Sequence, residues 1–342
     1  MIRVGVIGYG YWGPNIVRNF NSGSLTRVTM VCDERADALQ RAQQLYPGLE
    51  ITRDAQELLR SPSVDVVAVV TPVWTHFDLA YAALMNGKHV FVEKPFTFTS
   101  QQAEELVNLA ERKHLQIMVD HTFLFTGAVK KMRQLIEDGT LGKLYYYDST
   151  RVNLGLFQHD VNVIWDLAPH DLSIMDYIIQ KEPEAILATG KSHLNGHEDV
   201  AFLTFYFPDS VIAHVNVNWL SPVKIRTTLI GGEKKMLVWN DLEADEKLRI
   251  YDKGVEKVNS SQGIYDMLVK YRTGDMWAPQ VENTEALKAE LQYFAHCINH
   301  GETPVNDGKA GWRVVRMLEA ANESLRNRGG AVEFRAEVEF AA

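Results

Sequence analysis

A glycine-rich turn near the amino terminus constrains the fold of this chain more strongly than any other feature. Gly8, Gly10 and Gly13 follow the apolar run Ile2 to Ile7 and open an amphipathic segment. In this context Gly8 permits a tight turn, Gly10 lets the backbone approach a pyrophosphate, and Gly13 allows close packing of helix on strand. The amide groups at the start of such a helix face a diphosphate. The turn therefore predicts a strand, a dinucleotide-binding loop and a helix in succession.

An acidic residue completes the predicted cofactor site. Asp33 follows the second apolar run, at about the 20-residue distance where a carboxylate accepts hydrogen bonds from the adenosine ribose hydroxyls. Such a carboxylate repels a 2′-phosphate, which favours NAD as the cofactor. Arg35 could instead accommodate that phosphate, so NADP stays open as the less favoured alternative. Tyr11 and Trp12 lie within the glycine turn and are assigned with it to the cofactor site.

The pattern of apolar runs changes along the chain and divides it into two domains. Up to residue 122, short apolar runs alternate with amphipathic stretches, which predicts a doubly wound parallel sheet of Rossmann type. Beyond it, longer apolar runs follow one another directly and predict a large, mainly antiparallel open sheet. We expect an α/β protein with a cofactor domain over residues 1–122 and a substrate-binding and oligomerisation domain over residues 123–342. A carboxyl-terminal helix could pack back on the first domain.

These patterns also predict the individual elements. The expected strands are 2–7, 26–32, 64–70, 89–92, 116–120, 143–153, 200–207, 211–219, 223–230, 234–240 and 248–252. The expected helices after the first are 36–45, 55–59, 77–86, 101–113, 166–179, 285–299 and 312–326. Within 211–219 one face is apolar and the other carries His214 and two asparagines. That polar face could be solvated or could pack against a second subunit.

Composition excludes several classes of protein. A hydrophobic fraction of 46% and a charged fraction of 23% are typical of a folded globular chain. The net charge of -9 and the absence of a basic run argue against nucleic acids and anionic membranes as partners. Two cysteines are too few for a disulfide framework, and no apolar stretch approaches the length of a membrane span. We expect a cytoplasmic enzyme.

Two polar clusters follow predicted strands, at the carboxyl ends where open parallel sheets bind ligands. Thr71-Pro72 with His76 follows one strand, and Glu93-Lys94 follows the next. All five are assigned to the cofactor site. Lys94 is also a catalytic candidate, because a cation stabilises negative charge developing on an alcohol oxygen. The alternative is that Glu93 and Lys94 form a plain solvated ion pair.

A second catalytic candidate is the pair Asp166 and His170, four residues apart and therefore on one helix face. His170 suits general acid/base work near neutral pH, and Asp166 would position substrate hydroxyls. The alternative is structural: Asp166 fits an N-cap, with Pro169 tolerated in the first turn. Together with His159 and Asp160 the pair could be drawn as a metal site, but this spacing matches no metal motif, so none is predicted.

Five segments together resemble the Gfo/Idh/MocA family of oxidoreductases: Gly8–Gly13, Thr71-Pro72 with His76, Gly87-Lys88-His89-Val90 before Glu93-Lys94-Pro95, Asp166 with His170, and Pro304-x-x-Asp307-Gly308. The resemblance implies a Rossmann domain joined to an α/β domain whose open sheet forms a homodimer or homotetramer interface. It also implies that Lys94, Asp166 and His170 are catalytic, with the histidine as proton acceptor and the lysine as an orienting and electrostatic group.

Three segments resemble the branch of this family that acts on nucleotide sugars: Gly8 to Asn15, Trp165 to Asp171 and Tyr271 to Asp275. This implies oxidation of the C3 hydroxyl of a UDP-N-acetylhexosamine, for amino sugars of surface glycans such as lipopolysaccharide. Arg151, Asn153 and His159, with His170, are the candidate substrate contacts, and Arg151 could pair with the diphosphate. The alternative for these three is ordinary polar residues at a strand edge.

Two departures from the family pattern bear on substrate detail. Asp120-His121-Thr122 replaces a more usual Gly-His, and Val73-Trp74 replaces a common Asn. Other functions therefore stay open: a free sugar or inositol dehydrogenase, an NADPH-dependent keto-sugar reductase, or a non-catalytic NAD-binding regulator. Retention of all three catalytic candidates counts against the regulator, because a sensor has no chemical need for an acid/base pair.

Overall fold

The computed structural model describes residues 1–155, 158–257 and 269–334. The chain forms two compact units. The first contains Met1–Phe125 and Thr284–Glu319, and the second contains the described residues of Thr126–Asn283 and those from Ala320 onward. The first crossing lies close to the expected boundary after residue 122. Residues 284–319 were expected in the second domain, apart from a helix that could pack back, but they belong to the first unit.

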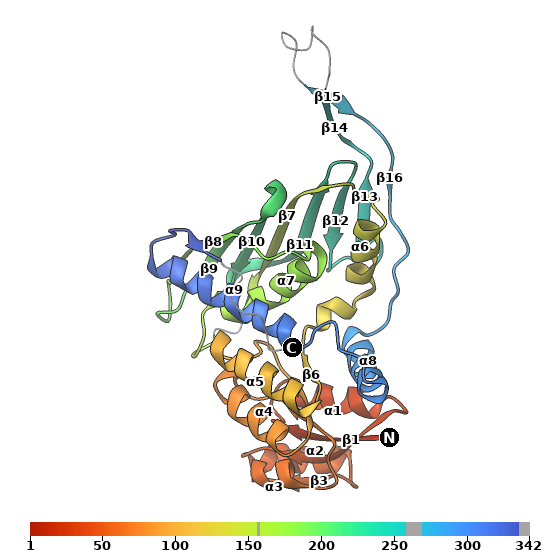
Figure 1. The fold of residues 1–342 in the computed structure, drawn as a ribbon, viewed down its shortest axis with the longest axis vertical. Coiled ribbons are helices and arrows are strands. Elements are labelled where there is room, and N and C mark those ends of the chain that lie inside the picture. Colours follow the sequence, from red (N-terminus) through yellow and green to blue (C-terminus); the bar gives the residue numbers. More distant parts are fainter. Residues whose placement is uncertain (156–157, 258–268, 335–342) are drawn as a thin grey trace. The chain divides into compact units, whose positions relative to one another are not determined.

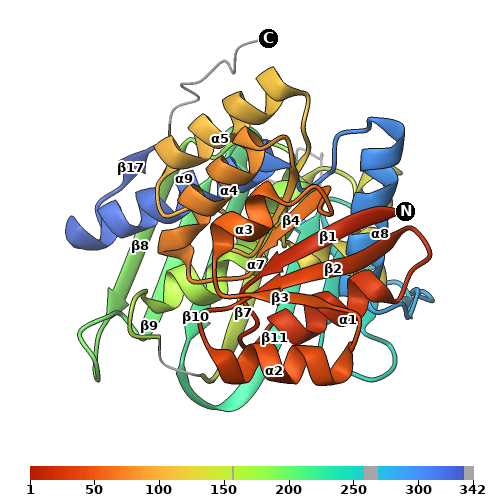
Figure 2. The same ribbon diagram turned by 90° about the horizontal axis from the view of Figure 1, so that it is seen from below.

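A six-stranded parallel sheet forms the centre of the first unit (Figure 2). Its order is β3-β2-β1-β4-β5-β6, the order of a dinucleotide-binding sheet. The strands are β1 (Ile2–Ile7), β2 (Thr26–Cys32), β3 (Glu50–Thr52), β4 (Val66–Val69), β5 (His89–Val92) and β6 (Ile117–Val119). The prediction of a doubly wound sheet is confirmed, although the short edge strand β3 was not foreseen.

Helices connect and cover these strands. They are α1 (Gly13–Asn21), α2 (Ala36–Leu45), α3 (Ala55–Arg60), α4 (His76–Met85), α5 (Ser100–Lys113), α8 (Ala286–His300) and the part of α9 (Gly308–Arg326) up to Glu319, with the 3-10 turns η1 (Val73–Thr75) and η2 (Thr122–Phe125). None of the described helices combines the length and apolar character needed to cross a membrane.

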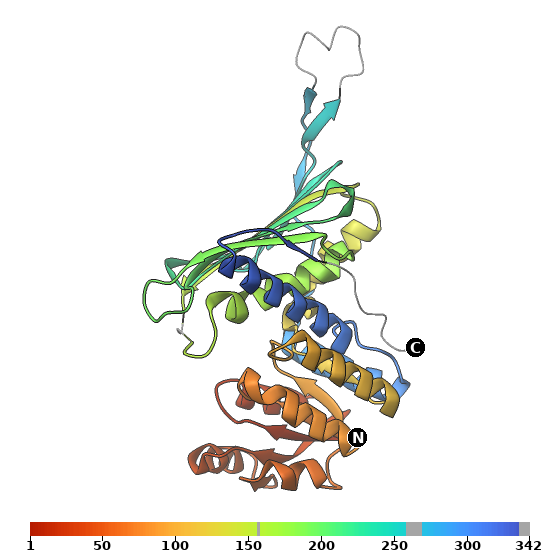
Figure 3. The ribbon, with the colours of Figure 1, turned by 60° about the vertical axis from the view of Figure 1, so that its left-hand side comes forward.

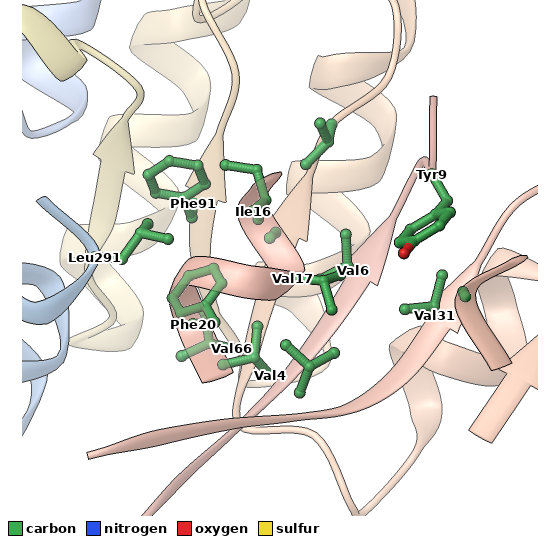
Figure 4. Packing of buried hydrophobic residues seen from close by; sticks show 14 of the residues in the cluster. Val4, Val6, Tyr9, Ile16, Val17, Phe20, Val31, Val66, Phe91 and Leu291 are labelled. Atoms are coloured by element: carbon green, nitrogen blue, oxygen red, sulfur yellow. The ribbon is translucent and has the colours of Figure 1, made fainter. Parts of the chain in front are cut away.

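Helix α8 is distant in the chain from the strands of the first unit but packs into its core. Phe20 on α1, Phe91 on β5 and Leu291 on α8 lie together (Figure 4), and the ring of Phe91 is 6.3 Å from that of Phe294, centroid to centroid. Leu287, Leu291 and Phe294 recur at helical spacing, so α8 has one apolar face to bury. Burying each such side chain contributes about 1.5–3 kcal/mol, which binds α8 to this core.

The second unit is built on a nine-stranded sheet with the order β16-β13-β12-β11-β7-β10-β9-β8-β17 (Figure 1). Its strands are β7 (Leu144–Leu154), β8 (Ala185–Lys191), β9 (Val200–Tyr206), β10 (Ile212–Asn218), β11 (Leu220–Gly232), β12 (Met236–Asn240), β13 (Leu248–Tyr251), β16 (Met276–Trp277) and β17 (Val332–Glu333). β14 (Gly254–Lys257) and β15 (Val269–Arg272) form a separate hairpin. Neighbours pair antiparallel except β7 and β10, which confirms the expected sheet but adds one parallel pair.

Helices cover one face of this sheet. α6 (Gly127–Glu137) and α7 (Val163–Ile179) lie on the same side of it (Figure 3), and α7 contacts β7, β9 and β10. Ala213, Val215 and Val217 of β10 are fully buried, whereas His214 and Asn216 point to the other face. The predicted alternation along β10 is therefore confirmed. Among the described residues, no helix covers the second face.

Candidate functional site

Backbone hydrogen bonds place the predicted cofactor residues side by side at the carboxyl ends of the parallel strands. Gly8 N donates to Cys32 O at 2.8 Å, and Glu93 N donates to Val69 O at 2.9 Å. Asp120 N donates to Val92 O at 2.8 Å. These bonds extend the ladders just past the carboxyl ends of the strands. The side chains that follow the strands therefore start from neighbouring positions along this edge.

The glycine turn has the form that the sequence predicted. Gly8 has a φ of +100°, and a Cβ placed there would lie 2.2 Å from Val70 O. A Cβ on Gly13 would lie 2.5 Å from Gly8 O. Gly10 differs, because the nearest atom to its Cβ position is 4.0 Å away, on Arg35. Gly8 and Gly13 thus meet local packing needs, while Gly10 leaves an open backbone surface that fits the diphosphate of a dinucleotide.

Asp33 is held in place by its neighbours. Its Oδ2 accepts a hydrogen bond from Tyr9 N at 2.7 Å, and its Oδ1 accepts from Arg35 N at 2.9 Å and Arg35 Nε at 3.1 Å. Burial opposes ionisation, but these donors outweigh it and hold the pKa of the Asp33 carboxyl below its usual range. Arg35 Nη2 is a fourth donor, to Oδ2 at 3.2 Å, so the roughly four lone-pair sites of the carboxylate are all engaged and a ribose hydroxyl would displace one of these bonds. Arg35 neutralises part of the charge that would repel a 2′-phosphate.

Other predicted cofactor residues border these loops. Tyr11 and Trp12 are exposed beside Gly10, with their ring centroids 5.5 Å apart in an edge-on arrangement. The Thr71 hydroxyl accepts a hydrogen bond from Thr75 Oγ1 at 2.7 Å, and Pro72 precedes η1 on the surface. Their contact with a cofactor stays a prediction.

His76 has a different role from the one predicted. Its side chain is buried, with Nδ1 2.9 Å from Pro95 O and Nε2 2.7 Å from Thr71 O. Burial lowers the pKa of this imidazole despite those two contacts. Because both ring nitrogens face backbone carbonyls, His76 braces the loop after β4 against the loop after β5. The structure therefore contradicts direct cofactor binding by this side chain.

Glu93 and Lys94 do not form a solvated surface pair. The Glu93 side chain is buried, and its Oε2 accepts a hydrogen bond from the backbone N of Lys94 at 3.1 Å. Burial and the nearby charge of Asp120 raise the pKa of the Glu93 carboxyl group well above its usual range. Lys94 itself is half-buried at the end of β5. Glu93 thus belongs to a buried carboxyl cluster, and a role in direct cofactor contact stays a prediction.

Helix α7 begins earlier than predicted. Asn162 is its N-cap, and the Asn162 side chain accepts a hydrogen bond from Trp165 N at 3.2 Å. Asp166 is therefore not the cap, and Pro169 lies inside the helix rather than in its first turn. An internal proline removes one helical hydrogen bond, at a cost of about 3 kcal/mol that surrounding packing must offset.

Asp166 is oriented by a tryptophan that was not among the predicted site residues. Trp219 is fully buried, and its Nε1 donates to Asp166 Oδ2 at 3.0 Å. The backbone N of Trp219 donates to Asp199 O at 2.9 Å, which anchors the indole from its other end. His170 lies one turn beyond Asp166 on α7 and is half-buried. The helix thus presents a carboxylate in a fixed orientation and an imidazole on one face.

The Arg151 side chain is buried in an ion pair and is not exposed to a substrate diphosphate. Its side chain is 3% exposed, and Nε donates to Asp171 Oδ2 at 2.5 Å. Ser149 Oγ donates to the other oxygen of the same carboxylate at 2.5 Å. Since an arginine buried in such a pair is already committed, the structure contradicts the predicted diphosphate contact.

The remaining predicted substrate residues are more accessible. Asn153 is half-buried near the end of β7, and His159 is exposed, with its carbonyl oxygen 3.2 Å from His197 Nε2. A nearby pair was missed: His193 Nδ1 lies 2.7 Å from Oδ1 of the buried Asp199. No sequence signal marks that pair. In the part of the chain that the structure describes, no group of three His, Cys, Asp or Glu side chains is arranged to hold a metal ion.

Two family models match the chain. One, described as an oxidoreductase family with an NAD-binding Rossmann fold, covers residues 2–121, and the other, a GFO/IDH/MocA C-terminal domain, covers residues 129–238. Several relatives match over nearly the whole chain. An uncharacterised oxidoreductase of Escherichia coli is 32% identical, with 96% of this chain and 97% of that protein covered.

Two relatives of stated activity are similar at lower identity. The UDP-N-acetylglucosamine 3-dehydrogenase of Acidithiobacillus ferrooxidans is 26% identical over 92% of this chain and 94% of its own length. A solved structure of that enzyme superposes with a TM-score of 0.80, at 25% identity, covering 96% of this chain and 98% of that chain. The scyllo-inositol 2-dehydrogenase (NAD(+)) of Bacillus subtilis is also 26% identical, over 95% and 94%.

Fold, glycine turn and relatives together define an oxidoreductase that uses a nicotinamide cofactor and acts on CH–OH groups. The chain belongs to the Gfo/Idh/MocA family.

Proposed function

We propose that this chain oxidises the C3 hydroxyl of UDP-N-acetylglucosamine, or of a related UDP-N-acetylhexosamine, to the 3-keto sugar with NAD. The observation that carries this proposal is the similarity, over nearly the whole chain and at a TM-score of 0.80, to the enzyme of Acidithiobacillus ferrooxidans with that activity. The product would serve an aminotransferase that makes 3-amino sugars for surface glycans.

In the proposed reaction His170 accepts the proton of the sugar hydroxyl, because an imidazole exchanges protons near neutral pH. Asp166, fixed by Trp219, accepts hydrogen bonds from sugar hydroxyls and orients the substrate. Lys94 stabilises negative charge on the reacting oxygen as its proton leaves. When bound, the nicotinamide would accept the hydride. The Gly8–Gly13 loop would hold its diphosphate and Asp33 its adenosine ribose.

The preference for NAD over NADP belongs to the same proposal. The ionised carboxylate of Asp33 directly follows β2, where it would repel a 2′-phosphate. Its ion pair with Arg35 weakens that repulsion, so we expect preference rather than exclusion.

A free polyol is the second candidate substrate. The scyllo-inositol dehydrogenase of Bacillus subtilis is as similar in sequence as the nucleotide-sugar enzyme. Burial of Arg151 also removes the one cation that had been assigned to a diphosphate. A polyol substrate would need the same acid/base pair but no contact for phosphate.

A substrate screen separates these candidates. The purified protein would be mixed with NAD and either UDP-N-acetylglucosamine, UDP-N-acetylgalactosamine, scyllo-inositol or glucose, while thermal stability and NADH absorbance are recorded. We expect stabilisation and NADH formation with the UDP-sugars, and at least about a hundredfold lower turnover in His170→Ala with NAD binding retained. NADH formation with inositol alone would replace the nucleotide sugar by a polyol. Full activity in His170→Ala would remove His170 from the mechanism.

A further inference from the structure

The loop between β8 and β9 ties the start of α7 to the end of β10. The backbone N of Val163, the first residue of α7, donates to Glu198 O at 2.9 Å. Asn162 Nδ2 donates to Glu198 Oε2 at 3.0 Å. On the next residue of the loop, Asp199 O accepts the bond from Trp219 N. Two consecutive residues, Glu198 and Asp199, therefore hold both the start of α7 and the tryptophan that follows β10.

Asp199 and Trp219 both point to the helix-covered face of the sheet. Asp199 directly precedes β9 and lies two residues before the fully buried Ala201. Trp219 directly follows β10 and lies two residues after the fully buried Val217. Side chains two residues apart along a strand point to one face. Both side chains belong to residues with an exposed fraction of 0%, so the carboxylate and the indole are buried on the side of the sheet where α7 lies.

A histidine of the same loop satisfies the buried carboxylate of Asp199. His193 Nδ1 lies 2.7 Å from Asp199 Oδ1, and His193 N donates to Asp199 Oδ2 at 2.8 Å. Burial opposes ionisation of this carboxyl group, but the hydrogen bonds from His193 outweigh it and hold the Asp199 pKa below its usual range. Because the carboxylate is ionised and only accepts, the proton of this contact belongs to Nδ1. The two bonds fasten the loop to the start of β9.

Space for the indole of Trp219 depends on a glycine. A Cβ on Gly155 would lie 2.7 Å from Trp219 Cδ1 and 3.3 Å from Trp219 Nε1. Gly155 N also donates to Trp219 O at 3.2 Å, so the backbone of residue 155 cannot move away without losing that bond. The indole packs on this backbone, and its Nε1 donates to Asp166 Oδ2 at 3.0 Å. A side chain at position 155 would therefore displace the donor of the bond to Asp166.

We propose that Trp219, Asp199, His193 and Gly155 form one support for the Asp166 carboxylate and fix its orientation. All four are positioning residues, because they act through Asp166, and their effect on turnover rests on the proposed function of Asp166. Since α7 and the indole are bound to the same two residues of the loop, neither can shift without breaking a buried hydrogen bond. The support thus holds the carboxylate in one orientation before a substrate hydroxyl arrives, which removes part of the entropy cost of binding.

A double-mutant cycle tests whether Trp219 acts through Asp166. Trp219→Phe keeps a buried ring but removes the N–H donor. We expect it to lower kcat/KM for the sugar or polyol roughly tenfold, because a hydrogen bond to a charged group is lost, and to leave KM for NAD unchanged. In an Asp166→Ala background, with turnover read at high enzyme concentration, Trp219→Phe should change kcat/KM by less than about twofold. Trp239→Phe, at a buried tryptophan of β12, is the control and should have no effect on kcat/KM. Equal losses in both backgrounds would overturn the proposal.

The bond between His193 and Asp199 is tested by rescue with a conservative variant. His193→Ala removes the ring donor and should lower kcat/KM in the same way as Trp219→Phe. His193→Asn places an amide N–H near the position of Nδ1, so it should restore most of the lost kcat/KM. Steady-state kinetics of the two variants would measure this difference. Wild-type kcat/KM in His193→Ala, or a His193→Asn as impaired as His193→Ala, would contradict the role of this bond.

Gly155→Ala disturbs the same support by a different route. The added Cβ meets the indole, so we expect a loss of kcat/KM that is again absent in the Asp166→Ala background. Gly48→Ala is the control, because the nearest atom to its new Cβ is 4.0 Å away. A folded Gly155→Ala with wild-type kcat/KM would show that the position of the indole does not matter for Asp166.

The indole N–H signal of Trp219 reports on the support without any need for turnover. The chain has seven tryptophans, and the signal that Trp219→Phe removes from the TROSY spectrum of nitrogen-15-labelled protein belongs to Trp219. We expect Asp166→Ala and His193→Ala to shift this signal upfield, because its hydrogen bond is lost or lengthened, and His193→Asn to leave it near the wild-type position. A signal that Asp166→Ala does not shift would disprove the indole–carboxylate bond. A signal that His193→Ala does not shift would remove the loop from the support.

These readouts separate the support from the proposed function. If the wild type oxidises a UDP-sugar and a folded Trp219→Phe is equally active, the positioning role fails and the proposed function stands. If no sugar or polyol supports NADH formation in the wild type, the proposed function fails, yet the indole signal still decides whether the support exists.

Discussion

At the scale of single residues, two aspartates that follow strands of the same parallel sheet differ in their electrostatics. Asp33 accepts hydrogen bonds from Tyr9 and Arg35, which lower its carboxyl pKa against the effect of burial. Asp120 faces two other acids, and burial raises its pKa. The residue type is the same and both lie on one sheet edge. The donors supplied by neighbouring loops decide which proton is lost first.

The first prediction concerns cofactor choice. Asp33→Ala should raise the KM for NAD roughly tenfold to a hundredfold and that for NADP much less, because hydrogen bonds to a charged group contribute about 1.5–3 kcal/mol. Asp33→Asn keeps an acceptor for Tyr9 N and serves as the structural control. Steady-state kinetics with both cofactors would measure the effect. Equal losses for NAD and NADP would exclude a ribose contact by Asp33.

At the scale of secondary-structure elements, α7 joins the candidate catalytic residues to the large sheet. One side of the helix carries Asp166 and His170, while Asp171 turns to β7 and pairs with Arg151. The helix thus has a functional face and a structural face. A charge pair buried at the second face holds the register of α7 on the sheet, and so the direction of His170.

The second prediction follows from that pair. Arg151→Ala should lower the free energy of unfolding by roughly 3–5 kcal/mol, because removing one partner leaves a buried charge uncompensated. Arg41→Ala, which breaks an exposed pair with Asp37 on α2, should cause no measurable change. Denaturant titration would measure both. A stable Arg151→Ala with a large increase in substrate KM would restore the diphosphate contact and contradict the structural role.

At the scale of the whole molecule, the open face of the nine-stranded sheet has large apolar side chains that nothing in the described chain covers with a helix. Phe202, Tyr206 and Ile212 are 42%, 45% and 40% exposed. Tyr206 and Ile212 are opposite each other in the β9–β10 pair, and Phe202 stacks on His214 at 6.4 Å. An uncovered apolar patch of this kind is typical of an interface with another protein chain.

The third prediction is that the protein is a homodimer or homotetramer through this face. Ile212→Lys should shift the molar mass measured by light scattering towards the monomer, because a lysine cannot be buried unpaired at low cost. Met85→Lys, at an exposed position of α4, is the matched control and should leave the mass unchanged. A monomeric wild type, or an unchanged mass in Ile212→Lys, would contradict the prediction.

Much of this architecture was determined by local sequence signals. Steric demands at Gly8 and Gly13, and alternation along β10, are properties of a few consecutive residues, and the structure confirms them. Tertiary structure alone decided which polar groups are buried together. The sequence does mark Glu290, because an acid beside Leu287 and Leu291 on the apolar face of α8 is unusual, but its neighbour Asp120, just after β6, is far away in the chain.

The difference between local signals and tertiary contacts also explains the predictions that the structure corrects. Arg151, His76 and the cap of α7 were assigned from residue type and local spacing, whereas their partners come from other elements. A side chain's charge and shape are encoded at its own position, so the sequence determined the fold class and the chemistry available. Burial and hydrogen-bond partners depend on chain segments brought together by packing, so only the tertiary structure decided how each group is used.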